Sequence, residues 1–94
     1  EGFLPHKKGK QTKIKSLLEE KRTTIFYESP HRITKSLQMI KDILGEDRKI
    51  VIGRELTKKF EEFVRGSVTD VLEHFEKNTP KGEFVLIIAG TDGK

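Results

Sequence analysis

The sequence of 94 residues contains no cysteine. Disulfide bonds, thiolate metal sites and cysteine nucleophiles are therefore excluded. The sequence also lacks an apolar run near the roughly 20 residues that a membrane-spanning helix needs, and it shows no signal-peptide pattern. We therefore expect no membrane association. The histidines His6, His31 and His74 do not stand at metal-ligand spacing, so we also expect no metal site.

Common catalytic and cofactor-binding signatures are absent as well. The sequence has neither a Walker loop nor a Gly-x-Gly-x-x-Gly motif. Ser29 lies two residues before His31, but a serine before a proline at a helix start is typical of a helix cap and not of a nucleophile. The chain begins Glu-Gly-Phe without an initiator methionine, which favours a fragment of a longer protein.

The composition predicts one small domain with a modest core. Apolar residues make up 33% of the chain and charged residues 36%, a balance that suits a small sheet or a piece that packs on a neighbour. The net charge is +4. Residues 6–15 hold five lysines and no acid, which is typical of a segment that binds a polyanion and also of a soluble, mobile loop.

The spacing of apolar residues predicts alternating strands and helices. We expect helices over about 12–21, from Ser29-Pro30 to a stop at Gly45, and over 67–77 with a capping box at Ser67 to Asp70. The predicted strands are 3–5, 23–28, 49–53, 60–65 and 83–89. Those at 23–28, 49–53 and 83–89 are apolar enough for the interior of a sheet.

These elements predict an α/β fold, a mixed sheet with helices packed on it. Strand 23–28, the following helix and strand 49–53 form a β-α-β unit, which favours a parallel pair with a right-handed crossover. Carboxyl ends of parallel strands share one edge of a sheet, so we expect Glu28 to lie near Arg54 and Glu55. The alternative is a solvated ion network around Arg54.

Two longer motifs and several short ones occur in order along the chain. Residues 26–32 read Phe-Tyr-Glu-Ser-Pro-His-Arg, and residues 54–62 read Arg-Glu-Leu-Thr-Lys-Lys-Phe-Glu-Glu. Together they resemble the C-terminal half of ribosomal RNA small subunit methyltransferase I, of the tetrapyrrole methylase-like superfamily. The shorter matches are Gly2-Phe3-Leu4-Pro5, Lys7-Lys8-Gly9, Arg65-Gly66 and Lys81-Gly82-Glu83-Phe84.

The resemblance implies a cytoplasmic enzyme in which two α/β domains enclose S-adenosylmethionine in the cleft between them. It also implies transfer of the methyl group to the ribose 2′-oxygen of a cytidine in the decoding centre of 16S ribosomal RNA. The family's glycine-rich cofactor loops belong to an N-terminal domain, and nothing like them occurs in this sequence. By this resemblance, residues 1–94 form a single C-terminal domain that is inactive alone.

The resemblance also assigns site residues. Contacts to the adenine side of the cofactor, largely from the backbone, fall at Tyr27, Glu28, Arg54, Glu55, Leu56, Gly82 and Glu83. Glu28 is a candidate catalytic base, although a residue of the N-terminal domain is equally suited. Tyr27 and Phe60 are candidates for stacking on a base or for core packing. The candidates for contacts with RNA phosphates are Lys7, Lys8, Lys10, His31, Arg32 and Lys58.

Three functions remain open from the sequence. The first is the C-terminal part of a methyltransferase that uses S-adenosylmethionine. The second is a basic module that binds RNA without catalysis, and the third is a platform for homodimerisation. The first predicts cofactor affinity only with the missing domain present, and the second predicts salt-sensitive RNA binding by this chain alone.

Overall fold

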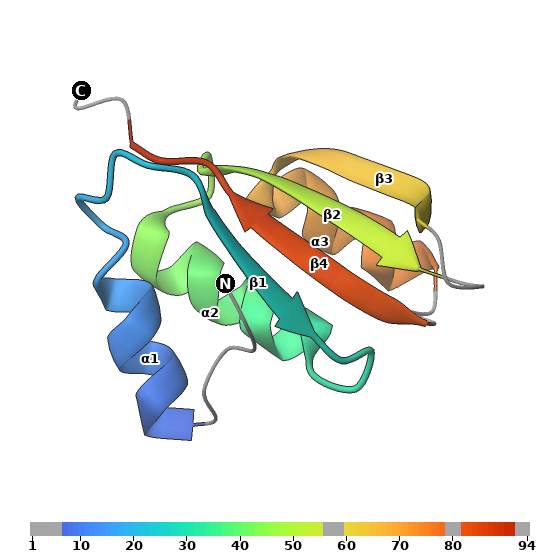
Figure 1. The fold of residues 1–94 in the computed structure, drawn as a ribbon, viewed down its shortest axis with the longest axis horizontal. Helices are drawn as coiled ribbons and strands as arrows, with labels where there is room; N and C mark the ends of the chain where they lie inside the picture. Colours follow the sequence, from blue (N-terminus) through green and yellow to red (C-terminus); the bar gives the residue numbers. More distant parts are fainter. Residues whose placement is uncertain (1–6, 56–59, 79–81, 92–94) are drawn as a thin grey trace.

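Helices and strands alternate along the part of the chain that the computed structural model describes, residues 7–55, 60–78 and 82–91 (Figure 1). The order confirms an α/β fold, and the strand expected at residues 3–5 lies outside the described residues. The elements are α1 (Lys7–Lys15), β1 (Thr24–Glu28), α2 (Ile33–Leu44), β2 (Lys49–Glu55), β3 (Phe60–Ser67), α3 (Val68–Lys77) and β4 (Glu83–Ile88).

The four described strands form one sheet in the order β1-β4-β2-β3. Every neighbouring pair is antiparallel, so the described sheet is antiparallel and not mixed as we expected. Strands β1 and β2 therefore run in the same direction, but the expected direct pairing between them is wrong because β4 lies between them (Figure 1). The apolar strand β4 gains two hydrogen-bonded neighbours at this central place. Strand β1, which we expected inside the sheet, is an edge strand of the described sheet.

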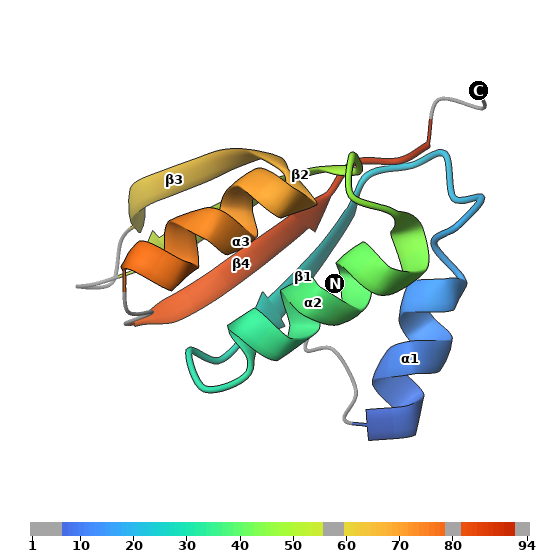
Figure 2. The ribbon, with the colours of Figure 1, turned by 180° about the vertical axis from the view of Figure 1, so that it is seen from behind.

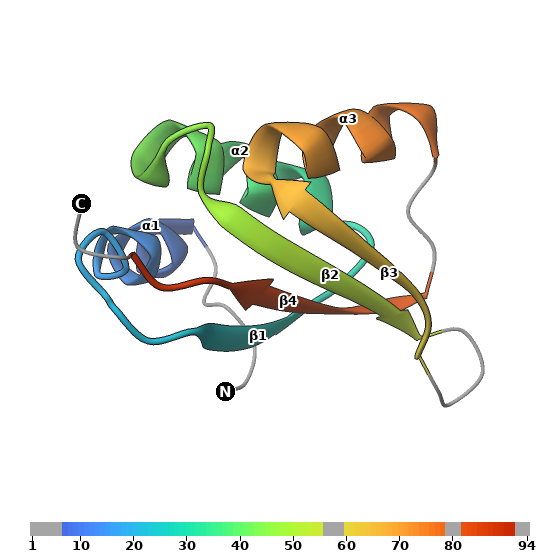
Figure 3. The same ribbon diagram turned by 90° about the horizontal axis from the view of Figure 1, so that it is seen from above.

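Helices α2 and α3 cover one face of the sheet, and α1 lies beside α2 (Figures 2 and 3). Along each strand, side chains that point to the covered face alternate with side chains that point to the opposite face, as in any pleated sheet. Phe26, Leu86 and Ile52 form one buried row across β1, β4 and β2. The apolar stripes of the three helices pack against such rows in a single core.

The opposite face of the sheet carries no helix in the part of the chain that the structure describes (Figure 3). We call it the open face. Ile25, Tyr27 and Phe63 point to this side, and they are 43%, 47% and 53% exposed. The apolar character that led us to place β1 inside the sheet therefore belongs to a surface.

The lysine-rich segment is helical. Helix α1 begins at Lys7 and ends at Lys15, so the expected start near Thr12, the expected end near residue 21 and the mobile-loop alternative are all wrong. Ile14 and Leu17 are buried in the core, as their spacing predicts, whereas Leu18 is 49% exposed. The early start is explained by Lys10, which turns inward from the first half of the helix and is only 5% exposed.

The ends of α2 and α3 show how far local signals decide a boundary. Helix α3 has the predicted capping box, with Ser67 and Asp70 each accepting a backbone N–H from the other. Gly45 ends α2 with a φ of 100°, as expected for glycine. Helix α2 begins at Ile33 and not at Ser29-Pro30, because residues 29–32 form a turn in which the Arg32 amide donates to the Ser29 carbonyl.

Arg48 links the turn that follows α1 to the residue that follows β4. Its Nε donates to the Ala89 carbonyl and a terminal nitrogen donates to the Leu17 carbonyl, both at 2.8 Å. The amide of Thr91 donates to the Glu20 carbonyl nearby, at 2.7 Å. These bonds hold α1 against the rest of the fold and so fix the position from which Lys10 enters the interior.

Candidate functional site at one edge of the sheet

The carboxyl ends of β1 and β2 meet the start of β4 at one edge of the sheet. Phe84 pairs with Glu28 on one side and with Arg54 on the other, and Glu83 pairs with Glu55. Two strand spacings separate Glu28 from Arg54, which is about 10 Å. The predicted convergence is therefore confirmed, although the inserted strand is antiparallel to both. We call these residues, Glu28, Arg54, Glu55 and Glu83, the strand-end edge.

Glu28 lies on the covered face and is 1% exposed. Its Oε2 accepts from the Ser36 hydroxyl at 2.5 Å and from Lys10 Nζ at 2.9 Å. Its Oε1 accepts from the Ser29 amide at 3.0 Å and from Arg32 Nε at 3.2 Å. Four donors from three segments thus surround one carboxylate.

These contacts keep Glu28 ionised. Burial raises the pKa of the Glu28 carboxyl, but hydrogen bonds from Ser36 and Lys10 outweigh it, and the pKa lies below its usual 4.5. A carboxylate that is enclosed, and whose oxygens already accept four hydrogen bonds, is a poor proton acceptor for a substrate. The geometry therefore favours a positioning role for Glu28.

We expect the stability of the fold to fall in acid through Glu28. The folded chain holds this carboxyl at a lower pKa than the unfolded chain, so the stabilisation is complete above about pH 4.5 and is lost as the pH falls through the lowered value. Urea unfolding at about pH 7 and about pH 3 measures the loss.

The double variant Lys10→Met/Glu28→Gln is the control, because it replaces the buried pair by neutral groups of similar shape. Its stability should change less between the two pH values than that of the parent chain. High salt suppresses the exposed pair of Glu20 with Arg22, where a hydrogen bond from Arg22 lowers the pKa of Glu20 to about 2. An identical pH dependence for both chains would contradict the assignment.

Arg54 holds the other end of the strand-end edge. A terminal nitrogen of Arg54 pairs with Glu62 Oε1 at 2.8 Å, so part of the ion network that we gave as the alternative is present. The Nε of Arg54 and the hydroxyl of Ser29 are buried, and neither has a hydrogen-bond partner among the described residues. Buried polar groups are nearly always paired, so two such donors near one edge indicate a place where a polar ligand can bind.

Of the remaining predicted residues, some are buried in the structure and others are accessible. Lys10, expected to contact RNA phosphate, is instead buried against Glu28. His31 is exposed and the Arg32 side chain is 39% exposed, so both are accessible. Tyr27 lies on the open face, where it does not serve as core within this chain. Gly82, with a φ of 82°, directly precedes β4.

Other predicted positions lie wholly or partly outside the described structure. Leu56 and Lys58 lie outside the described residues, and the described part of Lys7, Lys8, Glu55 and Phe60 is limited to the backbone. Sequence reasoning missed Ser36, which donates to Glu28. Its signal was a polar residue on the apolar stripe of α2, between Ile33 and Leu37.

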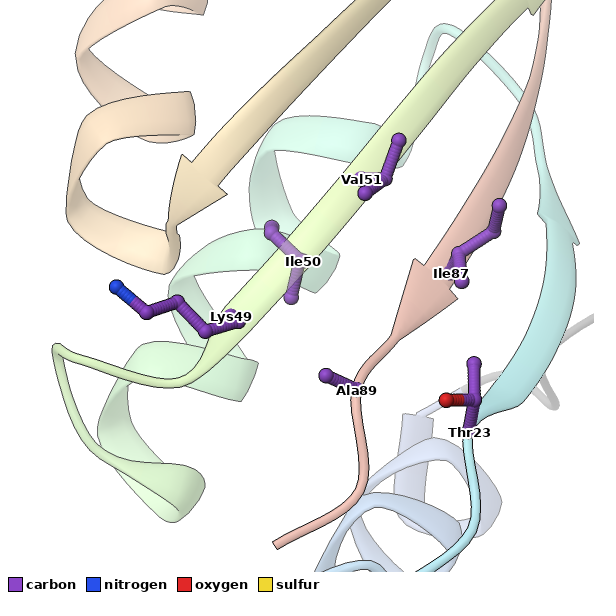
Figure 4. A pocket seen from close by; sticks show the side chains of 6 residues that line it. All are labelled: Thr23, Lys49, Ile50, Val51, Ile87 and Ala89. Carbon is purple, nitrogen blue, oxygen red and sulfur yellow. The ribbon is translucent and has the colours of Figure 1, made fainter. Parts of the chain in front are cut away.

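A pocket of about 190 Å³ lies at the opposite end of the sheet from the strand-end edge (Figure 4). Its lining is almost entirely apolar, and the Lys49 side chain extends away from it. Binding sites for polar ligands usually contain a few convergent polar groups, which this pocket lacks. The lining residues are Thr23, Lys49, Ile50, Val51, Ile87 and Ala89.

The described residues form neither a candidate metal site nor a candidate membrane-spanning helix. Among them, no three histidine or acidic side chains come together in a group that could hold a metal ion. None of the described helices is both long enough and apolar enough to span a membrane.

The chain is similar over almost its whole length to part of several bacterial proteins named Ribosomal RNA small subunit methyltransferase I. The relative from Thermotoga maritima is 44% identical over 92 residues, which are 98% of this chain and 41% of that protein. The relative from Synechocystis sp. is 46% identical over 91 residues, 96% of this chain and 33% of that protein. The relative from Bacillus subtilis is 42% identical over 94 residues, 99% of this chain and 32% of that protein.

These identities confirm the resemblance found in the motifs, and the chain is homologous to part of these proteins. No model of a protein family matches the chain. The chain spans about a third to two fifths of the length of these relatives. The activity of a whole protein is therefore a matter for proposal.

Proposed function

We propose that this chain forms one side of the active site of a methyltransferase that uses S-adenosylmethionine and modifies small-subunit ribosomal RNA. The finer assignment is methylation of the ribose 2′-oxygen of a cytidine in 16S ribosomal RNA. One observation carries the proposal, the 44% identity over 92 residues with the Thermotoga maritima relative of that name. In this proposal the rest of the protein supplies the glycine-rich cofactor loops.

The strand-end edge fits the cofactor side of such a site. The proposed contacts are Tyr27, Glu28, Arg54, Glu55, Leu56, Gly82 and Glu83. The unpartnered Nε of Arg54 supports this fit, since it is a buried donor that still needs an acceptor. The exposed Glu83 at the start of β4 offers an acceptor for hydroxyl or amino groups of a nucleoside.

S-adenosylmethionine, when bound, supplies an electrophilic methyl group. The residues of this chain bind and orient, and most of the rate enhancement of a methyl transfer comes from such positioning. The proton of the ribose hydroxyl needs an acceptor. Because the Glu28 carboxylate is enclosed by four donors, we assign it a positioning role and assign the acceptor to a residue outside this chain.

Methyl transfer from labelled S-adenosylmethionine to small-subunit ribosomal particles tests the proposal. The protein compared with this chain is a chimera in which the chain replaces the matching 92 residues of the Thermotoga maritima relative. We expect transfer by the chimera and none by the chain alone, with the label on a 2′-O-methylcytidine after digestion. A chimera that is folded and inactive on every ribosomal substrate would contradict the proposal.

A second candidate is an RNA-binding or dimerisation module without catalysis. The open face favours it, because Ile25, Tyr27 and Phe63 are large and exposed on one surface. A cytoplasmic homodimer is the assembly that we propose in this case. Self-association of the chain in ultracentrifugation, together with an inactive chimera, would favour this candidate over the first.

A further inference from the structure

The turn between β1 and α2 holds a positive charge in a fixed place. Arg32 Nε donates to Glu28 Oε1 at 3.2 Å, which anchors the guanidinium at its inner end. Within the described residues, the terminal nitrogens of Arg32 make no hydrogen bond, and the side chain is 39% exposed. An arginine anchored in this way presents a rigid pair of donors to the solvent, which suits bidentate binding of an oxyanion.

The net charge of Lys10, Glu28 and Arg32 also favours binding of an oxyanion. Lys10 and Glu28 neutralise each other in the interior, with side chains 6% and 1% exposed. Arg32 shares the same carboxylate, so the three groups together carry a net charge of +1. Arg32 is the one member that reaches the surface, and the excess charge is therefore presented there.

A neutral donor stands in the same turn. The Ser29 amide and Arg32 Nε both donate to Glu28 Oε1, which brings these two residues to one oxygen. The Ser29 hydroxyl is buried and has no hydrogen-bond partner in residues 7–55, 60–78 and 82–91. Rotation about χ1 to another staggered position therefore costs it no hydrogen bond and allows it to donate to a ligand.

We propose that the turn of residues 29–32 binds a phosphodiester group of RNA through the terminal nitrogens of Arg32 and the hydroxyl of Ser29. Glu28, Lys10 and Ser36 are positioning residues, since they hold Arg32 without touching the ligand. A phosphodiester of RNA and a free phosphate ion both present a phosphate oxyanion to these donors. The choice of RNA as its source rests on the proposed function.

Fluorescence anisotropy with a labelled single-stranded ribosomal RNA of about 12 nucleotides tests this site on the 94-residue chain. We expect Arg32→Gln to weaken binding about tenfold and to reduce the slope of log K against log salt by about 0.7. The matched control is Arg65→Gln, which removes the same charge from an exposed residue on the open face.

Two further variants separate binding from folding. Ser29→Ala removes a hydroxyl that has no protein partner, so it should weaken RNA binding about threefold without lowering the melting temperature or changing the salt slope. Lys10→Met/Glu28→Gln keeps the net charge of +1 but removes the charged anchor. We expect about threefold weaker binding from the loss of position alone.

Several results would overturn the site. They are a chain that does not bind the RNA, an Arg32→Gln variant that binds as Arg65→Gln does, and unchanged affinity in the double variant. Displacement of the RNA by inorganic phosphate at equal phosphate concentration would assign the turn to the free ion instead. The methyl-transfer activity of the chimera is a separate measurement, so an active chimera with any of these results refutes only this site.

Discussion

Replacing Lys10 by methionine is expected to destabilise the chain by about 3–5 kcal/mol, because it leaves the buried Glu28 carboxylate without its enclosed counter-ion. Removing one member of a buried ion pair costs more than the pair itself contributes, since the remaining charge keeps its desolvation penalty. Ser36 also loses the ammonium that donates to its hydroxyl at 2.6 Å. Urea unfolding near neutral pH measures the difference.

Two comparisons make this result specific to the pair. Lys15→Met removes the same charge from an exposed position of the same helix and should change stability by less than about 0.5 kcal/mol. The double variant Lys10→Met/Glu28→Gln should recover more than about half of the loss, because a neutral pair carries no buried charge. A cost below about 1 kcal/mol for Lys10→Met would show that water reaches Glu28.

Phe84→Ala should cost about 3–5 kcal/mol of unfolding free energy. Phe84 is 1% exposed, and its ring meets that of Phe75 edge to face, with centroids 5.4 Å apart. It also pairs with Glu28 on one side and Arg54 on the other, so the cavity would open inside the strand-end edge. Thermal and urea unfolding of the 94-residue chain measure this loss.

Phe63→Ala is the matched control, since Phe63 is 53% exposed on the open face. It should cost less than about 1 kcal/mol in the chain alone. Phe84→Leu keeps most of the buried volume and should cost about 1–1.5 kcal/mol. Equal losses for Phe84→Ala and Phe63→Ala would mean that the covered face of the sheet is not the core.

The sequence predicts the elements whose stabilising contacts are local. Helix α3 follows from its apolar spacing and its capping box, and the end of α2 follows from Gly45. Strand β2 follows from a continuous apolar run. These signals lie within a few residues of the structure that they specify, so one sequence is enough to recognise them.

Contacts between residues far apart in the sequence could not be predicted from such local signals. The place of β4 between β1 and β2 depends on contacts across more than 25 residues, and a β-α-β pattern is compatible with a strand inserted at that point. The burial of Lys10 depends on Glu28, 18 residues away, and on Ser36, 26 residues away. A lysine run without these partners is typical of a surface, which explains the wrong expectation.

The sequence predicts part of the strand-end edge from the direction of two strands. The shared direction of β1 and β2 brings Glu28 and Arg54 to one edge, whether or not the two strands pair directly. The sequence did not reveal the enclosure of Glu28, because three of its four donors come from side chains on α1 and near the start of α2. Those donors move the interpretation of Glu28 from a proton acceptor to a positioning residue.

In the proposed function, the strand-end edge is one side of a methyltransferase site. The most direct test is the rate of methyl transfer by the chimera carrying Arg54→Gln, compared with Arg65→Gln as the control. We expect a loss of about tenfold or more for Arg54→Gln, because its buried Nε then no longer serves the ligand, and little change for Arg65→Gln. Equal rates for the two variants, with the chimera active, would contradict the claim.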